Sequence, residues 1–152
     1  MRLVSNRFRV QVTNELSNQL LNRTSSAGVS DPLEPQLLIE VFREWKSGDE
    51  DGSYFFSRDS RPINGKYLHH AHMIPANMQD ELAKWDNNWR RHRKRTSDRY
   101  ILYADGGVSY GFLLIALIDD PGAHKLWNPE RRGEVEILEK VAENFANFGL
   151  LP

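Results

Sequence analysis

The stretch RYILYADGGVSYGFLLIALIDD, residues 99–120, decides the fold class of this chain of 152 residues. Its first part, RYILYAD, is rich in aromatic and aliphatic residues and runs into a Gly–Gly pair, which predicts a strand that ends at a turn. Its second part, VSYGFLLIALIDD, is apolar on both faces and therefore predicts a longer strand in the centre of a sheet. We expect a turn at residues 105–107 to join the two strands as an antiparallel hairpin.

A strand and two helices are predicted upstream of this hairpin. FRVQV, residues 8–12, has the alternation of a short strand. Thr13 or Asn14 can cap a helix that follows it, since both residue types are favoured at helix N-caps. A second helix is predicted over residues 35–46 by apolar side chains at helical spacing, and Gly48 ends it.

Three further elements complete the predicted fold. KYLHHAHMIP, residues 66–75, follows a turn signal at Asn64–Gly65 and predicts a strand. Residues 77–96 predict either a helix or a partly ordered connection, and an amphipathic helix follows Pro129. Helices kept apart from an antiparallel sheet indicate an α+β fold, here as a single domain over residues 1–152.

The composition excludes several classes of protein. Apolar residues make up 39% and charged residues 27% of the chain, as in a folded soluble domain rather than a disordered one. No apolar run approaches the roughly 18 to 20 residues of a membrane span, and the N-terminus lacks the apolar block of a secretory signal. The absence of cysteine excludes disulfides and thiolate metal sites, so we expect a cytoplasmic protein without membrane contact.

A basic cluster interrupts this nearly neutral chain, whose formal net charge is only -1. Within NNWRRHRKRTSDRY, residues 87–100, the cations are Arg90, Arg91, Arg93, Lys94, Arg95 and Arg99. A solvated helix face would account for them, but like charges repel one another unless an anion is near. Flanking aromatic residues could stack on unpaired bases, which favours RNA as that anion. An acidic protein partner would satisfy the same charges.

Histidines supply the second chemical signal. On a strand, His70 and His72 share one face and His69 lies on the other. The pair could join a third ligand in a zinc site, contact RNA, take part in acid–base chemistry, or simply be partly exposed strand residues. His124 and Lys125 follow the central strand in a loop, where functional side chains are common.

Several short motifs, taken in order, resemble the YafO-type mRNA interferase toxins of bacterial type II toxin–antitoxin systems. The family pattern R-T-[NS]-D is similar to residues 95–98, and a family tyrosine in the following strand matches Tyr103. The family ending P-x-x-H-K-L is similar to residues 121–126. Further similar motifs are FFSRDS (55–60), HAHMIP (70–75), LLIALI (113–118) and KVAENF (140–145). The resemblance covers most of the chain from about residue 40 onward.

The resemblance implies a fold, an activity and partners. The implied fold is RelE-like, with N-terminal helices packed on a twisted antiparallel sheet and a C-terminal helix. The implied activity is that of an endoribonuclease, or mRNA interferase, which needs no metal or cofactor and cuts mRNA on the translating ribosome. The expected partners are therefore mRNA, ribosomal RNA and a cognate antitoxin that silences the activity.

Site residues are carried over from the matched motifs. The implied catalytic residues are His70, His72, Arg95, Asp98, Tyr103, His124 and Lys125. The histidines would transfer protons, Arg95 would clamp phosphate, Asp98 would orient a neighbour, and Tyr103 would stack on a base or assist proton transfer. RNA binding is expected from Arg90, Arg91, Arg93 and Lys94 in the basic cluster, and from Arg58.

Two other functions stay open at this point. A toxin of the same fold could act on a target other than RNA, such as a topoisomerase. A non-enzymatic module that binds RNA or protein could carry the same histidines as structural residues. Any of His70, His72 and His124 could act as the base or as the acid.

Overall fold

A computed structural model of the chain describes residues 5–21, 34–48, 53–57, 67–75, 79–118 and 123–152. Three features noted in the sequence, Arg58, the Asn64–Gly65 turn and Pro121, lie outside these described residues. The helices are α1 (Asn14–Leu21), α2 (Pro35–Ser47), α3 (Gln79–Arg90), α4 (Gly107–Tyr110) and α5 (Arg132–Phe148). Two short 3-10 helices precede α5, namely η2 (Ala123–Trp127) and η3 (Pro129–Arg131).

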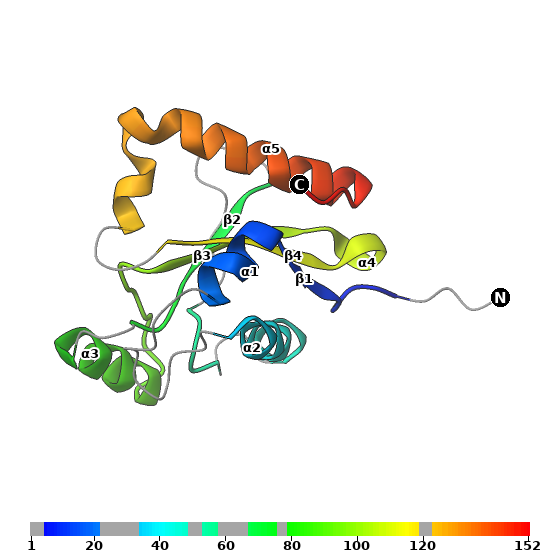
Figure 1. The fold of residues 1–152 in the computed structure, drawn as a ribbon. Coiled ribbons are helices and arrows are strands. Elements are labelled where there is room, and N and C mark those ends of the chain that lie inside the picture. Colours follow the sequence, from blue (N-terminus) through cyan, green and yellow to red (C-terminus); the bar gives the residue numbers. More distant parts are fainter. Residues whose placement is uncertain (1–4, 22–33, 49–52, 58–66, 76–78, 119–122) are drawn as a thin grey trace.

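The predicted hairpin forms the centre of a four-stranded sheet (Figure 1). The strands β1 (Val10–Val12), β2 (His69–His72), β3 (Tyr100–Asp105) and β4 (Phe112–Ile118) lie in the order β1-β4-β3-β2. β3 pairs antiparallel with both β4 and β2, whereas β1 pairs in parallel with β4. The fold is therefore α+β as predicted, with a mixed sheet rather than a wholly antiparallel one. β4 is an inner strand, as its apolar sequence predicts.

Caps set the helix ends that the sequence predicts. The Thr13 hydroxyl accepts a hydrogen bond from the backbone N–H of Leu16 at 3.1 Å and donates one to the carbonyl of Ile115 at 3.0 Å. This N-cap confirms the predicted start of α1 and ties that helix to β4. The predicted start of α2 at Pro35 and its end at Gly48 are also confirmed.

The connection between β3 and β4 differs from the predicted tight turn. Residues 107–110 form the single-turn helix α4, so β4 begins at Phe112 instead of within the VSYG segment. Gly111 has a φ of 71°, and a Cβ atom there would lie 2.2 Å from the carbonyl oxygen of Arg9. Only glycine fits where the two backbones approach so closely. Its left-handed backbone conformation is not that of a strand, so β4 starts at the next residue, Phe112.

Two apolar layers enclose the sheet, with α1 and α2 on one face and α5 on the other (Figure 1). In the first layer the buried ring of Phe42 lies 5.0 to 5.7 Å from four other aromatic rings. These rings belong to Trp45, Phe56, Tyr103 and Phe112. The amphipathic helix predicted after Pro129 is confirmed as α5, whose inward side chains belong to the second layer: Val135, Leu138, Val141, Ala142 and Phe145.

Candidate active site

Strand β2 divides the three neighbouring histidines between the two faces of the sheet. The ring of His69 stacks on that of Tyr103 on the α2 face, with the centroids 5.2 Å apart. The rings of His70 and His72 lie on the α5 face, 5.1 and 5.0 Å from the ring of Tyr100. The predicted shared face of His70 and His72 is thus confirmed. The register places His72 directly opposite Tyr100 on β3.

The backbone of Ser97 holds the imidazole of His72. Nδ1 of His72 lies 2.6 Å from the carbonyl oxygen of Ser97 and 3.1 Å from its backbone nitrogen. The shorter contact favours the tautomer in which Nδ1–H donates to the carbonyl, which leaves the Nε2 lone pair available. The Ser97 hydroxyl donates to the carbonyl of Met73 at 2.6 Å, and the backbone N–H of His72 donates to the Ser57 hydroxyl at 3.1 Å. The ring and the strand that carries it are therefore both fixed.

Burial sets the charge of His72. Desolvation lowers the pKa of His72 below its usual value, and the hydrogen bond with Ser97 opposes this shift. The nearby charges make smaller contributions, Lys94 lowering the pKa and Asp98 raising it. His72 is consequently neutral at neutral pH, which is the form in which a histidine accepts a proton.

The next residue along the chain, Asp98, holds a second imidazole. Its Oδ1 accepts a hydrogen bond from the backbone N–H of His124 at 2.9 Å and from the ring Nδ1–H at 2.7 Å. Because Nδ1 is occupied by the carboxylate, Nε2 is the ring nitrogen available to a substrate. The segment PGAHKLW, predicted as a loop, forms the helix η2 in its described part. This helix presents His124 and Lys125 to solvent, and the side chain of His124 is 66% exposed.

Buried aromatic side chains lie behind this exposed edge. His70 is only 6% exposed, and its ring lies 5.1 Å from those of both Tyr100 and Trp127. Burial raises the pKa of Tyr100, and the Trp127 indole N–H opposes the shift although it does not reach hydrogen-bonding geometry. The rings of His70 and His72 are 6.3 Å apart. His70 therefore belongs to the aromatic layer beside His72, while His124 lies at the exposed edge.

Two residues that the motifs assigned to the site lie elsewhere. Tyr103 is fully buried on the opposite face of the sheet, because it follows Tyr100 by three residues and strand neighbours alternate between faces. Arg95 is 5% exposed, lies 5.1 Å over the ring of Trp85 and donates to the backbone carbonyls of residues 53 and 54. Both side chains therefore make contacts inside the fold, which do not favour base stacking by Tyr103 or phosphate clamping by Arg95, and these two roles stay predictions.

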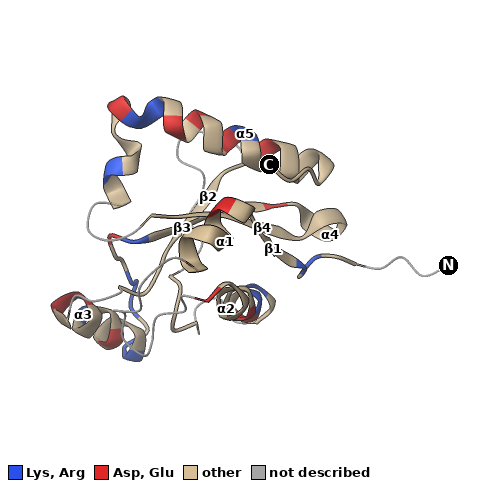
Figure 2. Ribbon diagram, viewed as in Figure 1, with Lys and Arg blue, Asp and Glu red and all other residues tan. Residues whose placement is uncertain are grey.

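The exposed part of the basic cluster begins in the last turn of α3 and continues beyond it (Figure 2). Its members are Arg90, Arg91, Arg93 and Lys94. The backbone N–H of His92 donates to the carbonyl of Trp89 at 3.2 Å, and that of Arg93 donates to the carbonyl of Asn88 at 2.8 Å. With His92 at a φ of 53°, these bonds form a Schellman motif. The partial negative charge at this helix end offsets part of the repulsion among the cations.

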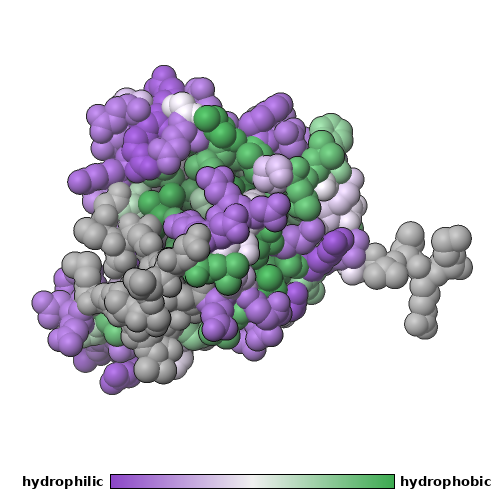
Figure 3. Space-filling model, in the orientation of Figure 1, coloured by the Kyte–Doolittle hydropathy of each residue, from purple (hydrophilic) through white to green (hydrophobic). Residues whose placement is uncertain are grey.

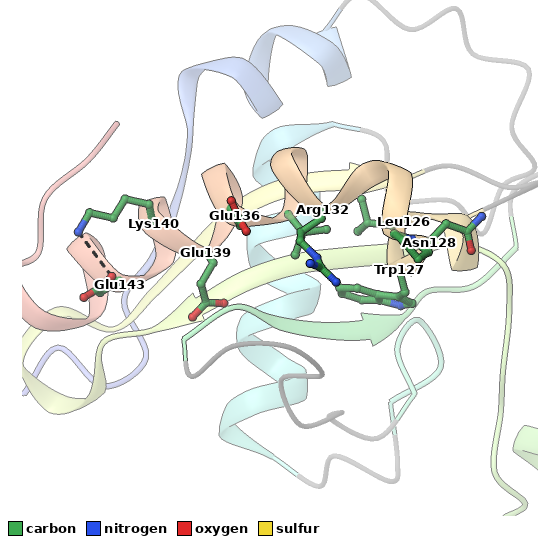
Figure 4. A pocket seen from close by; sticks show the side chains of 10 residues that line it. Leu126, Trp127, Asn128, Arg132, Glu136, Glu139, Lys140 and Glu143 are labelled. Atoms are coloured by element: carbon green, nitrogen blue, oxygen red, sulfur yellow. Dashed lines mark ion pairs between the residues drawn. The ribbon is translucent and has the colours of Figure 1, made fainter.

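Two hollows lie beside α5. One has a volume of about 500 Å³ and lies between η2 and α5, with Trp127 in its lining (Figure 4). The other measures about 270 Å³ and lies between α1, β4 and α5. Ile137 is one of the residues that line the second hollow, and its side chain is exposed. Figure 3 shows that hydrophobic residues also lie at the surface on this side of the molecule.

Metal-binding clusters and membrane spans are both missing from the described residues. Nowhere among them do three or more histidine, aspartate or glutamate side chains gather in a way that could hold a metal ion. In the same parts of the chain, no helix combines the length and the apolar character needed to cross a membrane.

Comparison with known proteins decides the family. The sequence profile described as Toxin YafO, type II toxin–antitoxin system, matches residues 43–147. The chain belongs to this toxin family. A cognate antitoxin is therefore a partner that the family implies, and both Ser97 and Asp98 lie inside the matched region of the toxin. No curated protein and no solved structure matches the chain.

Three residues of the candidate site were not predicted as site residues, although Tyr100 is one of the aromatic residues beside the basic cluster that were expected to stack on RNA bases. Ser97 lies inside the matched motif, but it acts through its backbone and so leaves no chemical signature in the sequence. Tyr100 could have been found from the register that places it opposite His72. Trp127 follows His124 by three residues, which is one turn of a 3-10 helix.

Proposed function

We propose that this toxin is a metal-independent endoribonuclease that cuts mRNA on the translating ribosome and thereby inhibits translation. The observation that carries the proposal is the segment Ser97–Asp98, in which the backbone of the first residue holds His72 and the carboxylate of the second holds His124. One imidazole is buried enough to be neutral, and the other is exposed beside a carboxylate. Such a pair can supply both the base and the acid that RNA cleavage requires.

Cleavage begins when Nε2 of His72 accepts the proton of the substrate's 2′-hydroxyl. The freed oxygen attacks the adjacent phosphorus, and the bond between phosphorus and the 5′-oxygen breaks. The imidazolium of His124 donates its proton to that leaving oxygen, while Asp98 stabilises the imidazolium beforehand. The products are a 2′,3′-cyclic phosphate and a 5′-hydroxyl end, so the reaction consumes neither water nor a cofactor.

Positive charge near this pair supports an anionic substrate. Lys125 is exposed on η2 next to His124 and supplies charge for the pentacovalent phosphate. The exposed part of the basic cluster lies just before Ser97 in the chain, where it suits contact with ribosomal RNA. Such contacts release counterions, so binding to the ribosome should weaken steeply as salt is raised.

A translation reaction with a defined mRNA, followed by primer extension and end-group analysis, tests the proposal. The toxin should leave cuts that end in a 2′,3′-cyclic phosphate, and His72→Asn and His124→Asn should each abolish them. His92→Asn is the matched control, because His92 is exposed and asparagine tolerates its left-handed backbone. Arrest of translation without cuts would indicate a toxin with another target. No effect at all would indicate a binding module, and either result overturns the proposal.

A further inference from the structure

Trp127 joins the pocket between η2 and α5 to the proposed active site. Its volume of about 500 Å³ is in the range of sites that hold small organic ligands. Trp127 lines the pocket and also packs against His70, with the ring centroids 5.1 Å apart. A flat group stacked on the indole would therefore lie one side chain away from the histidine layer.

One face of α5 supplies the charged lining of this pocket. Its members are Arg132, Glu136, Glu139, Lys140 and Glu143, whose spacing of three and four residues places them on one side of a helix. Figure 4 shows Arg132 extending from α5 toward Trp127, and Glu139 extending toward the sheet. The pocket thus combines an aromatic plane with charges of both signs.

Some of these charges already have partners. The Glu139 carboxylate accepts hydrogen bonds from the backbone N–H groups of Tyr67 and Leu68 at 2.7 and 3.0 Å. Lys140 forms an ion pair with Glu143 at 3.6 Å. Arg132 and Glu136 differ, because neither side chain has a hydrogen-bond or ion-pair partner within the described part of the chain. One cation and one carboxylate are therefore uncommitted beside the indole.

These three groups match the chemistry of an unpaired guanine nucleotide. An indole stacks on any base, and a guanidinium neutralises phosphate. A carboxylate only accepts hydrogen bonds, and guanine alone among the four bases presents two adjacent donor groups, N1–H and the N2 amine, on one edge. Two parallel bonds to one carboxylate would distinguish guanine from bases that offer it only one donor group.

We propose that this pocket binds the base of a guanine nucleotide beside the cleaved phosphate, with the base on Trp127 and its edge on Glu136. Arg132 contacts the phosphate of the same nucleotide. The inference rests on the proposed nuclease function and adds a base preference to it. Residues of α5, the helix that covers the face of the sheet carrying His70 and His72, would determine this preference.

Binding of short RNAs tests the pocket without any cleavage. Fluorescently labelled pentanucleotides UUGUU, UUAUU and UUIUU, where I is inosine, are made with 2′-O-methyl groups, which block the attacking hydroxyl. Fluorescence anisotropy with the full chain should show UUGUU binding about tenfold more tightly than UUAUU. UUIUU should fall between them, because inosine keeps N1–H and lacks the amine.

Glu136→Gln is the decisive variant, since Glu136 is exposed and glutamine has the same shape. It should reduce the guanine preference to less than twofold, whereas Glu44→Gln, an exposed glutamate on α2, should leave the preference unchanged. Trp127→Leu should weaken all three RNAs by about tenfold. Equal affinity for the three RNAs, or a preference that survives Glu136→Gln, overturns the guanine pocket.

The two proposals fail separately. Guanine preference in the binding assay without cuts in the translation assay supports the pocket and overturns the nuclease. Cuts that depend on His72 and His124, together with equal binding of the three RNAs, overturn the pocket and leave the nuclease intact.

Discussion

Replacing Asp98 by asparagine tests the contact on which the proposed general acid depends. Asparagine keeps an oxygen for the backbone N–H of His124 but removes the charge that holds the ring Nδ1–H at 2.7 Å. A hydrogen bond to a charged group contributes about 1.5 to 3 kcal/mol, compared with about 1 kcal/mol for a neutral one. The substitution therefore costs about 0.5 to 2 kcal/mol. The lower value is favoured because the side chain of His124 is 66% exposed and water screens the charge.

This cost falls mainly on the transition state, because His124 must carry its positive charge in order to donate a proton. At about 1.4 kcal/mol for each factor of ten, the rate constant for mRNA cleavage should fall about 2- to 30-fold. Single-turnover cleavage on stalled ribosomes at saturating toxin measures this constant. The free energy of unfolding should stay within about 1 kcal/mol of the unsubstituted toxin, as expected for a mostly exposed ion pair.

The control for this experiment is Asp80→Asn, which removes an exposed carboxylate in the first turn of α3. A double variant sharpens the test, because residues that act as a unit are not additive. Asp98→Asn combined with His124→Asn should cleave no more slowly than His124→Asn alone. Cleavage by Asp98→Asn at the unsubstituted rate would refute the assignment of His124 as the acid.

Four further predictions concern the pH dependence of stability, the end of α3 and two arginines of the basic cluster. Burial lowers the pKa of His72 in the folded toxin, while an unfolded histidine titrates near about 6.5, so the unfolded state binds the proton first as the pH falls. The free energy of unfolding, measured in urea between about pH 5.5 and 7.5, should therefore decrease below about pH 6.5, and should decrease less in His72→Asn. His92→Gly should raise this free energy by about 0.5 to 1 kcal/mol, because glycine adopts the left-handed backbone of residue 92 without strain, and a lower melting temperature would contradict this account. Arg93→Gln should reduce the salt dependence of ribosome binding by about one unit of slope and leave the melting temperature unchanged. Arg95→Lys should leave the salt dependence of ribosome binding unchanged, but it should slow cleavage and lower the melting temperature. A weaker salt dependence with an unchanged melting temperature would instead support phosphate binding by Arg95.

Patterns within single segments predicted most of the fold. Side chains alternate between the two faces of a strand, which predicts that His69 lies on one face of β2 and that His70 and His72 lie on the other. Apolar residues spaced three and four apart likewise predict that α5 is amphipathic. The Thr13 cap and the inner position of β4 likewise depend on residue types that lie close together in the chain. Such features are determined locally, and one sequence is enough to find them.

Contacts between distant segments account for what the sequence did not predict. The cations of residues 87–100 look alike in the sequence, yet Arg95 and Arg99 are buried while the other four are exposed. Which of them turns inward depends on the carbonyls of residues 53 and 54 and on Ile74. The placement of Tyr103 was predictable in principle, because its separation of three from Tyr100 sets the two on opposite faces of a strand.

The two buried arginines explain how an exposed basic segment can lead into a fixed site. Arg95 and Arg99 flank Ser97 and Asp98, and each donates to backbone carbonyls of another part of the chain. The Arg99 carbonyl also accepts a hydrogen bond from the backbone N–H of Met73 at 2.8 Å, which ties the segment to the end of β2. Catalytic groups must be held closely, because a displacement of about 1 Å can cost about a hundredfold in rate. Within residues 87–100, the four cations before residue 95 are then left to contact phosphate, while Arg95 and Arg99 hold the backbone that positions both imidazoles.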